Sequence, residues 1–209
     1  MATQPNYAAT TIAGSQALSA TADTSYTAPT HAVTVLSAAP ITVASVTTTS
    51  GSQQVTIASG TFSAAIGVSS GTLTQPWLAG MQVYGTGIPV GTTVLYVNGT
   101  NAFLSQAATA SGTVSLTAVS NGIRVEEVRF VATGTSVAGM AQLYLYDTNG
   151  NYHPDWTQII YNVIPSTTQV PFFAAVQFDN MELPPGWSLV ASSFVASQLI
   201  TVTAMGGSV

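Results

Sequence analysis

Two things are scarce in this sequence: cysteine is absent and charge is very low. The lack of cysteine among 209 residues excludes disulfides, thiolate metal sites and thiol nucleophiles. Lys and Arg total 2 against 7 Asp and Glu, which gives a formal net charge of −5. Two basic residues cannot form the positive surface that a nucleic-acid binder or a polybasic membrane anchor requires. We therefore expect neither nucleic acid nor a membrane as a partner.

Long apolar runs and a leader segment are also missing. No stretch approaches the roughly 18 uninterrupted apolar residues of a transmembrane helix. Met1 to Tyr7 has neither a basic start nor an apolar segment, so we expect no secretory signal and synthesis in a cytoplasm. Hydrophobic residues still make up 46% of the chain, which argues against disorder. The length suits one domain, or two small ones.

Small neutral residues take the place of charge. Ala, Thr, Ser and Val together supply 105 of the 209 residues, and Ser25 to Ile123 contains no charged side chain. One interpretation is a secreted β-protein with a Thr/Ser-rich face. The other is a protein whose surface is buried in assembly contacts, where charges would cost desolvation energy and small residues pack flat. We favour assembly, because unpaired edges of so neutral a β-protein would also risk aggregation.

Turn and strand signals predict an all-β fold. Short Val/Ile/Thr/Tyr runs end at Gly, Pro, Asn or Ser at intervals of about ten residues, and no convincing helical periodicity occurs. We expect a jelly-roll-like β-sandwich with an inserted small β-subdomain and an extended N-terminal arm. The expected division is 1–30 for the arm, 31–48 and 120–209 for the sandwich core, and 49–119 for the inserted subdomain. The arm is either a frayed terminus or a segment that crosses onto a neighbouring subunit.

The predicted strands include the runs 31–37, 41–48, 123–132 and 141–146. In the last run apolar residues alternate with Gln and Tyr, so the leucines are expected on one face and the tyrosines on the other. Asn98-Gly99 predicts a type I′ hairpin between the runs 92–97 and 103–106.

Three segments near the C-terminus have a distinctive composition. They read GTSVAGMAQLYLYD at Gly134–Asp147, LPPGWSLVAS at Leu183–Ser192 and TVTAMGG at Thr201–Gly207. Together they resemble a recurrent family of small tailed-bacteriophage virion structural proteins, over roughly residues 120–209. The resemblance implies a capsid or tail component and brings no active-site motif. Gln142 and Val190 stand where the family pattern has basic residues, so no role of those bases is carried over.

No residue pattern predicts catalysis, a cofactor or a metal. His31 and His153 have no nucleophile elbow nearby, and we expect them on a loop or strand edge. Asp147 to Asn151 with Asp155 is similar to the start of a calcium loop, but Gln158 stands at the twelfth position, where an acid is needed. A β-turn explains the same Asn and Gly residues. Paired carboxylates can hydrolyse sugars, as in tailspike enzymes, but this chain is too short for the long β-helix of a tailspike. The carboxylates in question are Glu126, Glu127, Asp147, Asp155, Asp179 and Glu182.

The only charge cluster is the segment Arg124-Val125-Glu126-Glu127-Val128-Arg129. On a regular strand Arg124 and Glu126 share one face, while Glu127 and Arg129 share the other. Such a strand has no purely apolar face. The segment is therefore either an exposed or bulged strand with self-neutralising pairs, or an inter-subunit salt-bridge site that sets register.

Tyrosines form the second candidate site. Tyr144 and Tyr146 would cover a subunit interface, where Tyr is enriched. Alternatively they form a carbohydrate-stacking patch together with Tyr152, Trp156 and Tyr161. Trp77 and Trp187 follow turns, and we expect both in the core.

These observations favour a non-enzymatic bacteriophage virion structural protein, made in the host bacterial cytoplasm. We expect a capsid decoration or cement protein that bridges capsomers of the major capsid protein and is itself a homo-oligomer, with a trimer favoured. The alternative is a tail fibre, spike or adhesin component that binds host-surface glycan. We expect no catalytic, cofactor-binding or metal-ligating residue. The expected interface residues are Arg124, Glu126, Glu127, Arg129, Tyr144 and Tyr146.

Overall fold

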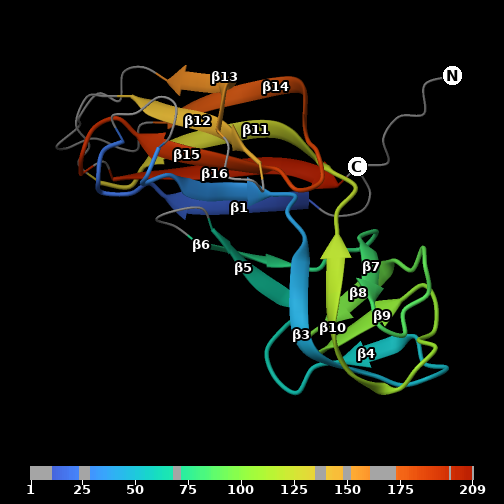
Figure 1. Ribbon diagram of the computed structural model, residues 1–209. Helices are drawn as coiled ribbons and strands as arrows, with labels where there is room; N and C mark the ends of the chain where they lie inside the picture. The colour runs from blue at the N-terminus through green and yellow to red at the C-terminus, as the bar shows by residue number, and fades with distance from the viewer. Residues whose placement is uncertain are drawn as a thin grey trace, which may run out of the picture.

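The chain folds into β-strands joined by turns and loops (Figure 1). The computed structural model describes residues 11–23, 29–67, 72–134, 140–147, 152–160, 173–197 and 199–208. All strand pairs within this part are antiparallel. The described residues contain no helix, and so none that is long and apolar enough to cross a membrane. The predicted all-β fold is confirmed.

Two four-stranded sheets pack face to face, and we call the pair the sandwich. One sheet has the order β1-β16-β11-β14 and the other has the order β13-β12-β15-β2. The strands are β1 (Thr11–Ala17), β2 (Val33–Ser37), β11 (Ile123–Ala132), β12 (Ala141–Tyr146), β13 (Tyr152–Ile160), β14 (Phe173–Leu183), β15 (Ser188–Ser193) and β16 (Ile200–Ser208). In Figure 1 they form the upper part of the molecule.

One hydrophobic cluster fills the space between the two sheets of the sandwich. Phe130 and Val202 enter it from one sheet, and Val35, Leu143 and Leu189 enter it from the other. Burying a side chain of this size contributes about 1.5–3 kcal/mol. The cluster therefore determines which face of each strand points inward, and the predicted alternation of 141–146 is confirmed.

A third sheet of six strands has the order β7-β10-β3-β4-β9-β8. Its strands are β3 (Ile41–Thr48), β4 (Gln54–Thr56), β7 (Gln82–Gly85), β8 (Val94–Asn98), β9 (Asn101–Leu104) and β10 (Gly112–Val119). The two outermost strands meet through a bridge between Gln82 and Thr93. Beside it, Val94 N–H donates to the Met81 carbonyl at 2.9 Å. The sheet thus closes on itself and protects these edges; we call it the closed sheet.

A separate hydrophobic cluster lies inside the closed sheet. Trp77 belongs to it: its ring packs against Phe62 with centroids 4.9 Å apart, and its Nε1 donates to the Ile41 carbonyl at 3.1 Å. A hairpin of β5 (Ser63–Gly67) and β6 (Thr72–Pro76) precedes this tryptophan. Trp187 is partly buried against the cluster of the sandwich. The predicted core position of Trp77 is confirmed, and Trp187 lies at the margin of its core.

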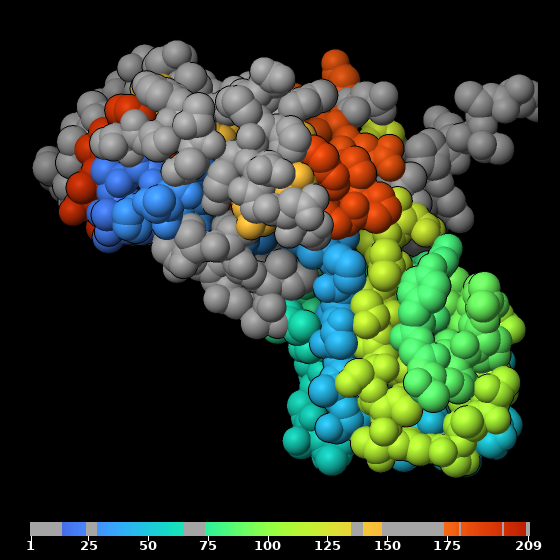
Figure 2. Space-filling model, in the orientation of Figure 1, coloured from blue at the N-terminus to red at the C-terminus, as the bar shows by residue number. Residues whose placement is uncertain are grey.

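Along the chain, the strands of the closed sheet come between β2 and β11 of the sandwich (Figure 1). The exit from β2 is fixed at Ala38, whose N–H donates to the Trp187 carbonyl at 2.7 Å and whose carbonyl accepts from Gly186 N–H at 2.9 Å. Leu78 packs against both hydrophobic clusters. Figure 2 shows β3 and β10 leading from the sandwich into the closed sheet.

The prediction that residues 41–48 belong to the sandwich needs correction. They form β3, which pairs with β10 and sends Ile41, Val43 and Val46 into the cluster of the closed sheet. Alternation shows which residues of a strand are buried, but it does not show which sheet the strand joins. The closed sheet therefore begins in the sequence at Ile41, directly after Pro40.

The predicted N-terminal arm, 1–30, also needs correction. Residues 11–17 form β1, which pairs along its whole length with β16 of the same chain. Residues 11–17 of the predicted arm thus complete the chain's own sheet. Residues 1–10 and 24–28 lie outside the described part.

The hairpin between β8 and β9 turns at Gly99 and Thr100, one position later than predicted. Asn98 and Asn101 are its last pair, and only Gly99 has a positive φ, of 57°. A type I′ turn requires positive φ at both central residues, whereas type II′ has glycine at the first. The predicted hairpin is present, but its turn is not of type I′.

Candidate functional site

The predicted charge cluster lies on β11, whose apolar residues face the core of the sandwich. A β-bulge between Val125 and Glu127 shifts the register with both neighbouring strands. The bulge makes Glu126 an extra residue, so Arg124, Glu127 and Arg129 all lie on the outer face. A regular strand would turn Arg124 and Arg129 to opposite faces, whereas this bulged strand, one of the two predicted alternatives, turns both to the outer face. A bulge explains how this irregular pattern keeps an unbroken apolar face.

Glu127 and Arg129 form an ion pair on this outer face. Arg129 Nε donates to Glu127 Oε1, and Gln177 Nε2 on β14 donates to Glu127 Oε2 at 2.8 Å. The hydrogen bond from Arg129 lowers the pKa of Glu127, and the Gln177 hydrogen bond and the Arg129 charge act the same way against the opposing effect of burial. The bond to Glu127 raises the pKa of Arg129. This pair neutralises itself within the chain, and its role at a subunit interface stays a prediction.

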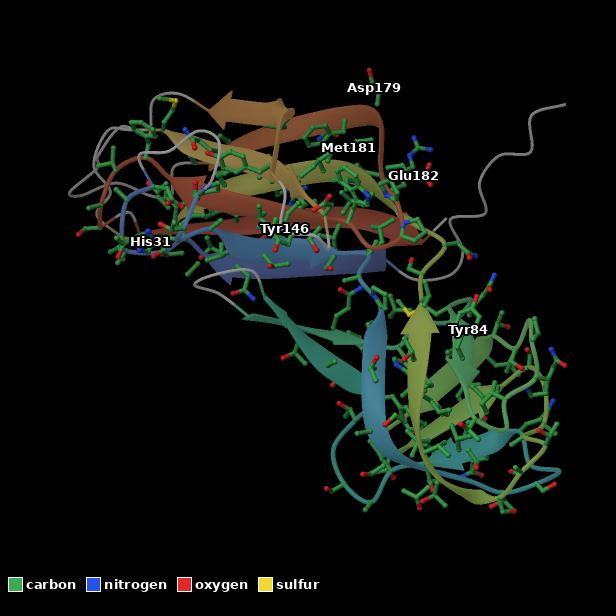
Figure 3. All side chains as sticks on the ribbon, in the orientation of Figure 1. His31, Tyr84, Tyr146, Asp179, Met181 and Glu182 are labelled. Carbon is green, nitrogen blue, oxygen red and sulfur yellow. The ribbon has the colours of Figure 1, made fainter. Side chains whose placement is uncertain are left out.

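Arg124 and Glu126 lie at the other end of the cluster. Arg124 Nη2 donates to the backbone oxygen of Asp179 at 3.2 Å, and Arg124 stands opposite Glu182 in the ladder. Figure 3 shows Asp179 and Glu182 at the same end of the sandwich. Glu126 is exposed at the bulge. Arg124 is thus attached to the backbone of β14, with the exposed Glu182 as its neighbour across the strand pair.

Tyr144 and Tyr146 lie on the outer face of the opposite sheet. They point away from the leucines of β12, which enter the core, so the tyrosines and the charge cluster do not form one site. Tyr144 is fully buried, packs with Val190, and donates its hydroxyl to Gln142 Oε1. Tyr146 is partly buried against this group (Figure 3).

The predicted carbohydrate patch around these tyrosines lacks its central member. A fully buried Tyr144 offers no ring face for stacking. The side chains of Tyr152 and Trp156, and the whole of Tyr161, lie outside the described residues.

Buried polar atoms surround Tyr144. Gln142, Thr34 and Ser192 share its face of the sheet and are almost completely buried. Within the described part, Gln142 Nε2, Thr34 Oγ1 and Ser192 Oγ have no hydrogen-bond partner. A buried polar atom without a partner costs about 1–3 kcal/mol. The bond between Tyr144 and the Gln142 oxygen therefore prevents a further penalty on this face.

Asp23 is a buried carboxylate whose role the sequence did not reveal. It is 2% exposed and accepts the backbone N–H groups of Thr30 at 2.7 Å and His31 at 2.9 Å. His31 Nδ1 lies 3.0 Å from Thr30 Oγ1 and 3.5 Å from Asp23 Oδ1. A catalytic triad places acid and nucleophile on different ring nitrogens, whereas both partners here share Nδ1. The arrangement ties residues 23 and 30–31 together, and it does not match a triad.

No metal site emerges from the described part of the chain, where no three His, Asp or Glu residues lie close enough to hold an ion. In the calcium-like stretch, Asp147 is described, residues 148–151 lie outside the described part, and Asp155 belongs to β13. The side chains of His153 and Asp155 lie outside the described residues.

An exposed pair of aromatic side chains lies on the closed sheet, and no sequence pattern predicted it. Tyr96 on β8 stacks on Phe103 on β9, with centroids 4.4 Å apart and an interplanar angle of 15°. Tyr96 is 51% exposed. Gln54 and Asn101 lie beside the rings and bond to each other at 2.8 Å. The turn predicted at Asn98-Gly99 would place Tyr96 opposite Asn101, whereas the observed turn at Gly99 and Thr100 places it opposite Phe103.

Comparisons with known proteins add no relative: no protein-family model matches this chain, and no curated protein shows significant similarity to it.

Proposed function

We propose that this chain is a non-enzymatic structural protein of a bacteriophage virion, and specifically a decoration or cement protein that bridges capsomers. The observation that carries the proposal is the scarcity of free charge on the surface. The chain has few charged side chains, and some of these are buried or paired with each other. Residues 41–119 contain no Asp, Glu, Lys or Arg. Asp23 is buried, and Glu127 is neutralised by Arg129. Free monomers ordinarily rely on surface charge for solubility, whereas the core of a protein interface is depleted of it.

We further propose that the sandwich is a jelly roll and that the closed sheet is its inserted subdomain. With the insert left out, the eight strands pair from the outside inward: β1 with β16, β2 with β15, β11 with β14, and β12 with β13. A long hairpin that rolls into two facing sheets has this nested order, which supports a jelly roll. Jelly rolls occur in viral capsids and in lectins and cupins. Because fold alone does not assign function, the virion role rests on the neutral surface and on the sequence resemblance of residues 120–209.

The outer face of β1-β16-β11-β14 is the contact surface in this proposal. Small side chains cover its β1 edge, where the Ser15 and Thr203 hydroxyls form a hydrogen bond with their oxygens 3.0 Å apart. The neutralised pair of Glu127 and Arg129 lies further along the same face. A flat surface of this kind suits a homotrimer or the major capsid protein. A subunit that binds only the assembled lattice stabilises it by mass action.

The tail-fibre or adhesin alternative, when it depends on Tyr144 and Tyr146, has weaker support because Tyr144 is buried.

The test is to incubate purified protein with matching capsids that have been stripped of accessory proteins, and to image them by cryo-EM. Regular added density that bridges capsomers is the expected result, and its symmetry gives the oligomeric state. Arg129→Glu places a second negative charge beside Glu127 on the proposed contact face, and it should lower the occupancy of that density. A shell that stays bare with the unaltered protein overturns the proposal.

A further inference from the structure

We propose that the outer face of β4, β9 and β8 on the closed sheet binds a neutral glycan, with Tyr96 and Phe103 as its stacking platform. The capsid proposal uses the outer face of the sandwich, so the two proposals concern different surfaces. They share only the observation that residues 41–119 contain no charged side chain.

The ladder places the residues of this site side by side. Phe103 stands opposite Tyr96 on β8 and opposite Gln54 on β4, so the three side chains share one face across three strands. The alternate residues Val55 and Ala102 are fully buried in the cluster of the closed sheet. Burial of these neighbours holds the platform outward.

The stacked rings supply an apolar surface of fixed orientation. Tyr96 remains 51% exposed although it stacks on Phe103. Because the stack restrains the ring before any ligand arrives, little side-chain entropy is lost on binding. The C–H face of a sugar ring packs well against an exposed aromatic ring of this kind.

Amide groups beside the rings supply hydrogen bonds for sugar hydroxyls. Gln54 Nε2 donates to Asn101 Oδ1 at 2.8 Å. This bond uses one N–H of Gln54 and the oxygen of Asn101. The Gln54 oxygen and the Asn101 NH₂ group therefore remain as an acceptor and a donor, and neighbouring hydroxyls on a sugar can satisfy both.

The lack of charge selects the class of ligand. Because residues 41–119 hold no charged side chain, this face cannot compensate a phosphate, sulfate or carboxylate group. Stacked nucleobases would need a basic groove for the phosphates of the nucleic-acid backbone.

A protein partner would need a larger surface. A stable protein interface covers about 800 Å² per side, which is far more than three strands about 4.8 Å apart provide around one aromatic pair. A neutral saccharide is the ligand that fits aromatic rings flanked by amides.

The experiment screens the full-length protein on an array of neutral gluco-, galacto-, manno- and rhamno-oligosaccharides, with sialylated and sulfated oligosaccharides beside them. The strongest neutral ligand is then titrated by calorimetry. Tyr96→Ala should weaken its binding about tenfold or more, the effect of losing one stacked ring. Tyr96→Phe keeps the ring and should bind within about threefold of the unaltered protein.

The matched control is Tyr84→Ala. Tyr84 is 47% exposed on β7 of the same sheet. Since β7 and β8 are antiparallel through the bridge of Gln82 with Thr93, Tyr84 and Tyr96 lie on opposite sides of that bridge. Tyr84→Ala should bind the glycan normally (Tyr84 is labelled in Figure 3). Circular dichroism and thermal melting confirm that each variant is folded.

Several results overturn the glycan site. They are the absence of binding to every neutral oligosaccharide, tighter binding of the anionic ones, and equal losses in Tyr84→Ala and Tyr96→Ala. Capsid binding by Tyr96→Ala is measured in parallel and should be unchanged. If this variant loses capsid binding while no glycan binds, the face is a protein contact and the glycan proposal fails, whereas the capsid proposal stands.

Discussion

The carboxylate of Glu127 is held by two donors on its own sheet, Arg129 and Gln177. Its pKa is lowered below the ordinary value of 4.5, so the ion pair stabilises the fold above that pH. The contribution is lost as the pH falls through the lowered pKa of the folded state. Carbon-detected NMR titration should place the midpoint of Glu127 below 4.5 and should return it toward 4.5 in Arg129→Gln. An identical midpoint in both proteins would contradict the pairing.

Tyr144 offers a second test on the opposite sheet. Tyr144→Phe removes the hydroxyl that bonds Gln142 and leaves the buried amide oxygen without that donor. We expect a loss of about 1–3 kcal/mol in the free energy of unfolding, measured by urea denaturation. Tyr144→Phe combined with Gln142→Met replaces both polar partners and should recover part of that loss. A double variant less stable than Tyr144→Phe alone would show that the amide has another role.

Among the strands, β1 is packed so closely against β2 that only glycine fits at position 14. A Cβ atom on Gly14 would lie 1.7 Å from the carbonyl oxygen of Val35. Gly14→Ala should therefore push β1 away from β2 and cost about 1–3 kcal/mol, again by urea denaturation. Ala17→Ser changes an exposed residue of the same strand and should shift stability by less than about 0.5 kcal/mol. Equal stability of both variants would mean that β1 can move without cost.

The sequence predicted a strand's position correctly where the alternation of apolar and polar residues and the flanking turn residues indicated the same boundaries. β3, β11 and β12 begin and end where the residue pattern predicts. The sheet that each strand joins did not follow, because long-range pairing depends on contacts that alternation does not encode. The strands β5 and β7 were not predicted, because four or five residues that end at a glycine are too few to show alternation.

The candidate sites were predictable to a smaller extent. Composition located the charge cluster, but the bulge at Glu126 decides which charges share a face, and a bulge requires knowledge of both neighbouring strands. Alternation placed Tyr144 on the outer face of β12, yet its burial depends on packing that is not local in sequence. The stacking of Tyr96 on Phe103 did not follow from the sequence either, because the turn predicted at Asn98-Gly99 pairs Tyr96 with Asn101, and only the observed register brings the two rings together.

In the whole molecule, two hydrophobic clusters predict two units that open separately. Leu116 is fully buried in the cluster of the closed sheet, and Leu189 is 1% exposed in that of the sandwich. Each Leu→Ala change should cost about 2–5 kcal/mol in its own unit. Hydrogen exchange by mass spectrometry should show Leu116→Ala accelerating β3 and β10 while β11 and β16 stay protected, with the reverse for Leu189→Ala.

A further test concerns the residue that packs against both hydrophobic clusters. Leu78 contacts both clusters, so Leu78→Ala should accelerate exchange in both units, though less than either deep substitution because its side chain is only partly buried. If Leu116→Ala and Leu189→Ala each accelerate exchange equally in both units, the chain unfolds as one cooperative body. If each effect stays within its own cluster, the closed sheet can open while the sandwich keeps its outer face intact. A subunit held on a shell by that face could then tolerate opening of its insert without release.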